Sequence, residues 1–177
     1  IIIANADKRS TAHRELISLA DEQEITIISP SRKSLPLSEH ASIKILDTGT
    51  PSYPLADDRC SIFLLHWRKK NILFYNDAGS LSETRIRKNY PKLTADIIVL
   101  GKHGNDHSVS ADFIFSLGVS HVIASQSSYP EGEMRSSQWI NKIRQSETKL
   151  LLLDHTGGII VTQGNDTLDI KTTRAYP

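Results

Sequence analysis

The feature that most constrains the fold of this chain is an alternation of short apolar segments with amphipathic ones. The apolar segments have the length and composition of buried strands and lie at residues 71–75, 96–101, 121–125 and 150–153. Helical patterns separate them, at residues 80–89, 110–117 and 136–146. Ser80 and Glu83 have the spacing of a capping box at the start of the first of these helices. The regular order of strand and helix predicts an α/β fold.

Further elements are predicted on both sides of this alternation. Apolar spacing of three and four indicates a helix through residues 15–20, which Ser10 or Thr11 could cap. Two hairpins and three single strands complete the prediction, and Pro30 and Pro36 mark a polar loop. The single strands are expected at 1–4, 24–29 and 42–46, and the hairpin strands at 60–67 with 71–75 and at 159–162 with 168–172.

Composition limits the organisation and the chemistry. A length of 177 residues without a dividing linker predicts one domain, residues 1–177. The net charge of +1 provides no global field toward nucleic acid or membrane. The single cysteine, Cys60, excludes an internal disulfide and a cysteine-rich zinc cluster. No apolar run reaches the ~20 residues of a membrane helix. Because the chain opens on Ile1 inside an apparent strand, we expect that it is a fragment with residues preceding it.

Aspartate and histidine follow four of the predicted strands. They are Asp7, then Asp77, then His103, Asp106 and His107 in one loop, and finally Asp154 and His155. The strand ends of an α/β sheet are where ligand sites form, and carboxylates with imidazoles are ligands of zinc and manganese. A metal hydroxide held in this way attacks phosphodiesters. The alternative is structural, because aspartate and histidine also form turns and caps, and this alternative applies to Asp77, Asp106 and His107.

Two other chemistries have weaker support. Basic residues cluster in the predicted 68–70 turn and on the 80–89 helix, where they could contact phosphate or form a solvated face. No aromatic residues are interleaved with them, which favours the solvated face. Ser108 and Ser110 lack the Gly-x-Ser-x-Gly elbow of a serine hydrolase, and we expect one of them to cap the following helix.

Several segments together resemble a known family. Residues 58–65 (DRCSIFLL) are similar to a strand of the Asn-Asp-x-Ser type, and residues 71–79 (NILFYNDAG) to a strand that ends in Thr-Gly-Asp-Ala. Residues 94–105 (TADIIVLGKHGN) resemble Ala-Asp-x-Leu-x-x-x-His-His-Gly-Ser, and residues 153–159 (LDHTGGI) resemble Thr-Asp-x-x-Gly-Ala-Ile. These motifs are those of the metallo-β-lactamase-like domain of the competence protein ComEC. The resemblance implies an α/β fold of the four-layer αββα sandwich type, incomplete at its N-terminal side because the first β-layer would precede Ile1.

The resemblance also implies a metal site, which this chain keeps only in part. Asp77 matches the aspartate that bridges the metals, and His103 matches the second histidine of its motif, whereas Lys102 replaces the first. The signature His-x-Asp-x-Asp-His falls on residues 3–8 (IANADK), where Asp7 survives and Lys8 replaces a ligand. Asp7, Asp77 and His103, with help from Asp106, could therefore hold at most one zinc or manganese ion.

What the resemblance implies about function follows from this reduced site. The family is thought to process the strand of DNA that is not imported, which implies single-stranded DNA and a membrane channel domain of the same protein as partners. It implies a periplasmic or otherwise extracytoplasmic location. We expect weak or absent phosphodiesterase activity, with Asp77 and His103 as its catalytic residues. An active metal-dependent nuclease and a non-catalytic interaction scaffold are the alternatives.

Overall fold

The computed structural model describes residues 11–27, 34–49, 60–101, 109–125, 136–164 and 167–175. Their main feature is a seven-stranded sheet with the order β1-β2-β3-β4-β5-β6-β7. Its strands are β1 (Ser34–Ser38), β2 (Ala41–Asp47), β3 (Ile62–Trp67), β4 (Lys70–Asn76), β5 (Ile97–Leu100), β6 (His121–Ala124) and β7 (Lys149–Leu152). β1 to β4 pair antiparallel, and β4 to β7 pair parallel. The sheet is therefore mixed, as the hairpin followed by strand and helix alternation predicts.

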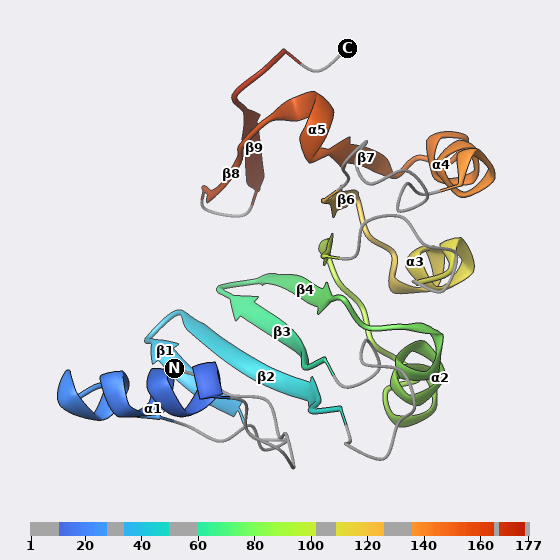
Figure 1. Ribbon diagram of the computed structural model, residues 1–177. Coiled ribbons are helices and arrows are strands. Elements are labelled where there is room, and N and C mark those ends of the chain that lie inside the picture. Colours follow the sequence, from blue (N-terminus) through green and yellow to red (C-terminus); the bar gives the residue numbers. More distant parts are fainter. Residues whose placement is uncertain are drawn as a thin grey trace.

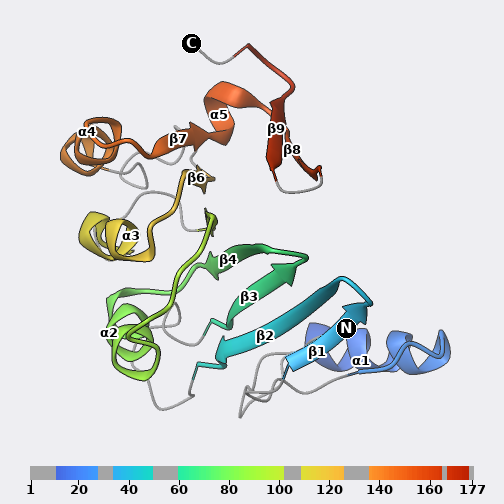
Figure 2. The same cartoon turned by 180° about the vertical axis from the view of Figure 1, so that it is seen from behind.

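Three helices connect the parallel strands, and all three cover the same face of the sheet (Figure 1). They are α2 (Ser80–Asn89), α3 (Ala111–Leu117) and α4 (Ser137–Arg144). Figure 2 shows the same arrangement from behind. The Ser110 side chain caps α3, Gly118 ends that helix with a φ of 68°, and Ser136 caps α4. Both N-caps and the glycine stop lie where the sequence predicts the helix boundaries.

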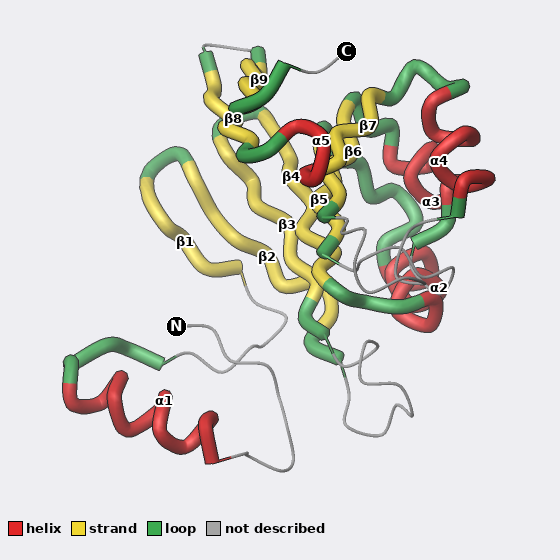
Figure 3. Tube along the Cα trace, turned by 45° about the horizontal axis from the view of Figure 1, so that its top comes forward, coloured by secondary structure: helices red, strands yellow, loops and turns green. Residues whose placement is uncertain are grey.

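A two-stranded hairpin, β8 (Ile159–Gln163) with β9 (Leu168–Thr172), lies on the opposite face of the sheet (Figure 3). Each face of the sheet has its own apolar cluster. Leu73, Ile98 and Val122 belong to the helix-side cluster, and Ile72, Ile97 and Ile123 to the hairpin-side cluster. Alternate residues of one strand thus enter different layers, which explains why β4 to β6 are apolar throughout. The order of layers among the described residues is helices, sheet, hairpin, which agrees with three of the four layers of the predicted αββα sandwich.

The N-terminal helix α1 (Thr11–Glu22) lies near β1, away from the other helices (Figure 3). The sequence predicts this helix correctly, yet it buries only Ala20 and leaves Leu16 and Leu19 about half exposed. No described helix is long and apolar enough to cross a membrane.

The structure corrects four details of the sequence prediction. Residues 25–27 form no strand, and Glu24 has a left-handed φ of 53° after the end of α1. The strand β1 was not predicted, because it contains Pro36, which an edge strand tolerates. Leu153 begins a one-turn helix, α5 (Leu153–Thr156), instead of extending β7. Glu83 does not form a capping box, since Gly79 is the N-cap and its helix has no side-chain cap bond.

Candidate functional site

The four parallel strands end at one edge of the sheet, which we call the carboxyl edge. Residues that follow or end these strands there are Asn76 and Asp77 after β4, Gly101 after β5 and Ser125 after β6. Asp154 follows β7 in α5. β2 also ends at this edge, because Asp47 pairs with Ile62 at the start of β3, beside the end of β4. Polar side chains from four strands, β2, β4, β6 and β7, are therefore brought to one edge, as in other α/β ligand sites.

Asn76 directs the chain away from the sheet at this edge. Its φ of 52° is left-handed, which asparagine tolerates better than most residues. Its side-chain amide donates to the Ser61 carbonyl oxygen at 2.7 Å, and its own carbonyl oxygen accepts from the Gly101 N–H at 3.0 Å. Asn76 thus ties the start of β3 and the end of β5 to the turn that precedes α2. This geometry explains how asparagine can stand where the resemblance has glycine.

Asp77 lies directly beside Gly101. A Cβ atom at position 101 would lie 2.6 Å from Asp77 Oδ1 and 3.0 Å from the Asn76 carbonyl carbon. The carboxylate therefore occupies space that only glycine at position 101 leaves open. Asp77 is exposed, and within the described residues it forms no hydrogen bond or ion pair. A cap or turn role for its side chain is thus not seen in this part of the chain.

Ser125 and Asp154 complete the described polar groups of the parallel strands at this edge. The Ser125 hydroxyl donates to the Gly101 carbonyl oxygen, and the Ser125 N–H donates to the Leu100 carbonyl oxygen at 3.1 Å. Asp154 has one carboxylate oxygen 3.7 Å from His155 Nε2, while the other is buried and has no hydrogen-bond partner among the described residues. Ser125 thus holds Gly101, the residue at which the predicted ligand loop starts.

Asp47, although it lies at the carboxyl edge, is engaged by an ion pair. Arg85 Nε and Nη2 lie 2.7 Å and 2.6 Å from Asp47 Oδ2, and the Gly49 N–H donates to the other oxygen at 3.1 Å. The Asp47 side chain is only 7% exposed and that of Arg85 19%. This carboxylate anchors α2 to β2 and is not available as a metal ligand.

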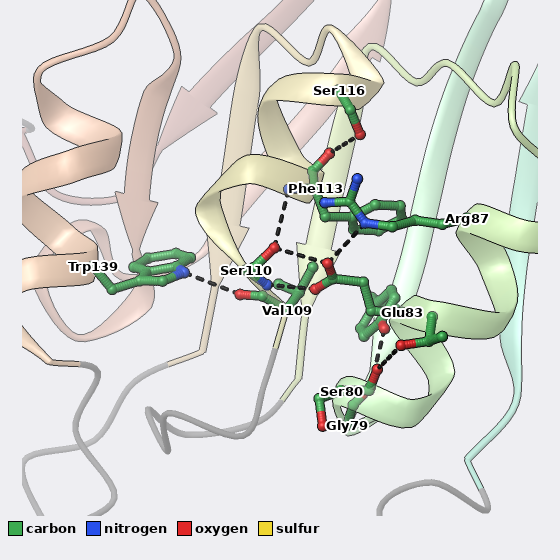
Figure 4. A network of polar contacts seen from close by, with 11 residues as sticks. Gly79, Ser80, Glu83, Arg87, Val109, Ser110, Phe113, Ser116 and Trp139 are labelled. Carbon is green, nitrogen blue, oxygen red and sulfur yellow. Dashed lines mark hydrogen bonds and ion pairs between the residues drawn. The ribbon is translucent and has the colours of Figure 1, made fainter.

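A polar network fixes the residues that follow the predicted ligand loop (Figure 4). Glu83 of α2 accepts from the Ser110 N–H at 2.7 Å and from its hydroxyl at 2.8 Å, and pairs with Arg87 at 2.9 Å. The Trp139 indole of α4 donates to the Val109 carbonyl oxygen at 3.0 Å. The spacing of Ser80 and Glu83 predicts a capping box instead, because a four-residue pattern cannot show that a carboxylate reaches another helix. Glu83 thus joins α2 to the N-terminus of α3.

Glu83→Ala should lower the free energy of unfolding by about 1 to 2 kcal/mol, because it leaves the Ser110 N–H, a part-buried donor, without its acceptor. Urea denaturation of the variant measures this loss. Glu15→Ala, at an exposed position of α1, is the control and should leave the midpoint unchanged. An equal stability of Glu83→Ala and wild type would contradict the anchoring role of Glu83.

Of the four predicted metal ligands, the described residues include Asp77. Asp7, His103 and Asp106 lie outside the described residues, as do Lys8 and His107. Where the chain is described, no group of three or more His, Cys, Asp or Glu side chains could hold a metal ion. The described part therefore supplies one of the four predicted ligands and does not by itself form a metal centre. The predicted ligand set remains a prediction.

Three residues of the predicted basic cluster form ion pairs within the chain. Arg85 pairs with Asp47, Arg87 with Glu83, and Lys70 with Asp96 at 2.8 Å. These three cations have carboxylate partners within the chain, which favours the structural interpretation of the cluster. His121 is half-buried, and its burial, followed by the nearby Lys149 charge, lowers its pKa.

These layers and this edge define the class of fold: a mixed α/β fold with a large mixed sheet, which a solved structure of low sequence identity shares. No family model and no curated protein matches the sequence. Among solved structures, one similar protein is described as a metal-dependent hydrolase from Parabacteroides distasonis. It aligns with a TM-score of 0.52 at 8% identity, over 85% of this chain and 74% of that one. At such identity the likeness shows the fold alone.

Two further solved structures align less well. The metallo-β-lactamase fold protein YhfI from Bacillus subtilis has a TM-score of 0.45 at 10% identity, over 82% of this chain and 55% of that one. The isothiocyanate hydrolase from Delia radicum gut bacteria has a TM-score of 0.46 at 16% identity, over 86% of this chain and 65% of that one. This chain thus spans less than two thirds of the length of both proteins.

Proposed function

We propose that this chain is part of a ComEC-like metallo-β-lactamase-fold domain in DNA uptake, with a reduced metal site and weak or absent phosphodiesterase activity. The observation that carries this proposal is the position of Asp77, an exposed carboxylate beside Gly101 at the carboxyl edge of the parallel strands. The sequence motifs around Asp77 and His103 support the ComEC-like part of the proposal. Single-stranded DNA as substrate and a membrane channel as partner rest on that resemblance.

The reduced site limits the chemistry that we propose. Lys8 stands where the motif has a histidine ligand, and an ammonium group there would repel a divalent cation. Asp47, the other carboxylate that ends a strand at this edge beside β4, already pairs with Arg85. A zinc or manganese ion would supply an activated water when bound, and Asp77 would be its main described ligand. One metal ion at most is expected, so a two-metal mechanism is not part of the proposal.

Calorimetric titration with zinc chloride and manganese chloride tests the proposal. Wild type should bind at most one ion per chain, and Asp77→Ala should remove that binding. Ser80→Ala, on an exposed residue three positions further along, is the control and should bind as wild type does. Cleavage of a labelled single-stranded oligonucleotide should be slow or absent. Two tight metal sites together with rapid cleavage would overturn the reduced-site proposal.

A non-catalytic scaffold is the second candidate, and it is supported by Lys8, which stands where the motif has a histidine ligand. A bound metal stabilises the folded state by mass action, so a thermal shift with and without a chelator separates the two candidates. A melting temperature that zinc and EDTA both leave unchanged supports the scaffold. A rise with zinc that Asp77→Ala removes supports the metal site.

A further inference from the structure

A polar hollow lies at the other end of the strands from the carboxyl edge. It has a volume of about 270 Å³ and forms where the turn between β1 and β2 meets the turn between β3 and β4. The Arg68 N–H donates to the His40 carbonyl oxygen at 2.7 Å and so joins the two turns. Both residues line the hollow, together with His66, Ser38 and Ser42. One guanidinium and two imidazoles are thus brought to one cavity, which we call the turn hollow.

The strand residues of the turn hollow belong to the face of the sheet that carries the helices. Ser42 pairs with His66, and His66 pairs with Asn71, so these three side chains share one face. Leu64 and Leu73, each two residues away along β3 or β4, pack in the helix-side cluster. The β8–β9 hairpin covers the opposite face (Figure 3). The turn hollow therefore lies apart from that hairpin and from any β-layer that packs beside it.

His66 is oriented so that one ring nitrogen is available to a ligand. Its Nδ1 lies 3.0 Å from Asn71 Oδ1, and the Asn71 amide nitrogen donates to the Thr94 carbonyl oxygen at 3.5 Å. Because an amide oxygen only accepts, His66 Nδ1 carries the hydrogen, and Nε2 lacks one in the neutral ring. Within the described residues Nε2 has no hydrogen-bond partner. At Nε2, His66 can therefore accept a hydrogen bond from a ligand or, once protonated, donate one to it.

Arg68 occupies a backbone position that favours other residues. Its φ of 52° is left-handed, at the first residue of a two-residue hairpin turn, where glycine or asparagine is usual. Arg68 is exposed, and its side chain forms no hydrogen bond or ion pair in the described part of the chain. Neither burial nor pairing among these residues compensates for the strained backbone. A ligand that binds the guanidinium would account for an arginine at this position.

We propose that the turn hollow binds a phosphate group. The guanidinium fork of Arg68 matches two phosphate oxygens. The imidazoles of His40 and His66 and two serine hydroxyls line the same hollow and can bond the remaining oxygens. Ser38 Oγ already accepts the His40 N–H at 3.2 Å, which leaves its own O–H to donate. Donors thus come from both turns and from β2 and β3, which suits a tetrahedral anion better than a planar carboxylate.

The other groups of the hollow limit its ligand. Glu39 also lines the hollow, and its carboxylate opposes an anion, so the attraction depends on Arg68 and the imidazoles. No three His, Cys, Asp or Glu side chains of the described residues form a group that could hold a metal ion, which argues against a metal in the hollow. The phosphate can belong to a small compound or to the end of a DNA strand. This inference goes beyond the proposed function and needs no metal.

Titration of the metal-free chain with sodium phosphate, at constant pH and ionic strength, tests the site. Nuclear magnetic resonance of the imidazole nitrogens follows His40 and His66 beside His155, which lies in α5 at the carboxyl edge. The signals of His40 and His66 should shift and saturate, and that of His155 should not move. Sodium chloride and sodium acetate should not reproduce the shift.

Two single-stranded oligonucleotides, with and without a terminal phosphate, identify the source of the phosphate. Tighter binding of the phosphorylated strand than of inorganic phosphate indicates the end of a DNA strand. Binding of inorganic phosphate that exceeds that of both strands indicates a small phosphate compound. Either result supports the proposed site.

Variants test the site from the protein side. Arg68→Gly should fold at least as well as wild type, because glycine suits the left-handed φ, and should weaken phosphate binding by about threefold to tenfold. Lys88→Ala removes an exposed cation from α2 and should leave the affinity unchanged. His66→Ala should also weaken binding, and His66→Gln, whose amide can donate near the place of Nε2, should weaken it less. Glu39→Gln should strengthen binding by about twofold to fivefold, and Glu147→Gln, the same change at an exposed position elsewhere, should not.

Three results would overturn the inference. Equal shifts with chloride and phosphate would show a response to ionic strength alone. An Arg68→Gly variant that binds phosphate as wild type does would show that the guanidinium is not part of a phosphate site. Shifts of His40 and His66 with zinc chloride, at concentrations where phosphate has no effect, would show that the hollow holds a metal ion instead.

Discussion

Asp47→Ala should lower the free energy of unfolding by about 3 to 5 kcal/mol, the largest loss that we expect from a single polar substitution in this chain. The reason is the guanidinium of Arg85, which lies with two nitrogens at 2.6 and 2.7 Å from one oxygen of Asp47 and is only 19% exposed. Removal of the carboxylate leaves that charge largely buried and also removes the acceptor of the Gly49 N–H. Urea denaturation followed by circular dichroism measures the change.

Two further variants show whether the loss comes from the buried pair. Asp112→Ala breaks the exposed ion pair with Lys142, whose side chains are 73% and 50% exposed, and should leave the midpoint unchanged. The double variant Asp47→Ala with Arg85→Met removes both charges and should recover part of the stability. A midpoint for Asp47→Ala within error of wild type would show that water compensates Arg85 at this edge.

The sequence predicts the centre of this fold well because the signals there are local. Apolar runs bounded by caps mark the strands β4 to β7 and the helices between them, and Gly118 takes the left-handed conformation expected of a helix stop. The predictions fail where a tertiary contact, and not the local sequence, determines the secondary structure. Residues 25–27 have strand composition but do not pair, whereas Pro36 lies in a strand because β2 offers a free edge. The local sequence does not determine which strand a segment pairs with.

The site shows the same division. The sequence places Asp77 at a strand end, and the structure shows why the carboxylate can lie there, since Gly101 from the next strand leaves the space. The sequence did not single out Asp47 or Ser125, because each acquires its role from a residue on another element. Knowledge of the strand order and of the pairing register of β2 and β3 would have placed Asp47 at the same edge. Neither follows from composition or periodicity.

Gly101→Ala adds a single methyl group, and it should disturb the proposed metal site more strongly than any other glycine-to-alanine substitution. Its Cβ would lie 2.6 Å from Asp77 Oδ1, so the flexible carboxylate must move away. It would also lie 3.0 Å from the Asn76 carbonyl carbon, and this backbone is held by the 3.0 Å bond from the Gly101 N–H. We expect a loss of about 1 to 3 kcal/mol in stability from this overpacking. Metal affinity should fall by about tenfold to a hundredfold, the usual effect of disturbing the support of a ligand.

Gly158→Ala is the control that separates the effect of steric crowding from the effect of moving Asp77. Among the described residues its Cβ would meet only Thr173, at 3.3 Å, so it should have a smaller effect on stability and none on metal binding. Calorimetric titration with zinc and urea denaturation of both variants give the two quantities. If Gly101→Ala binds zinc as wild type does, although Asp77→Ala does not, the carboxylate acts from another position than the one beside Gly101. If both bind as wild type does, Asp77 is not a ligand, and the strand end serves the fold alone.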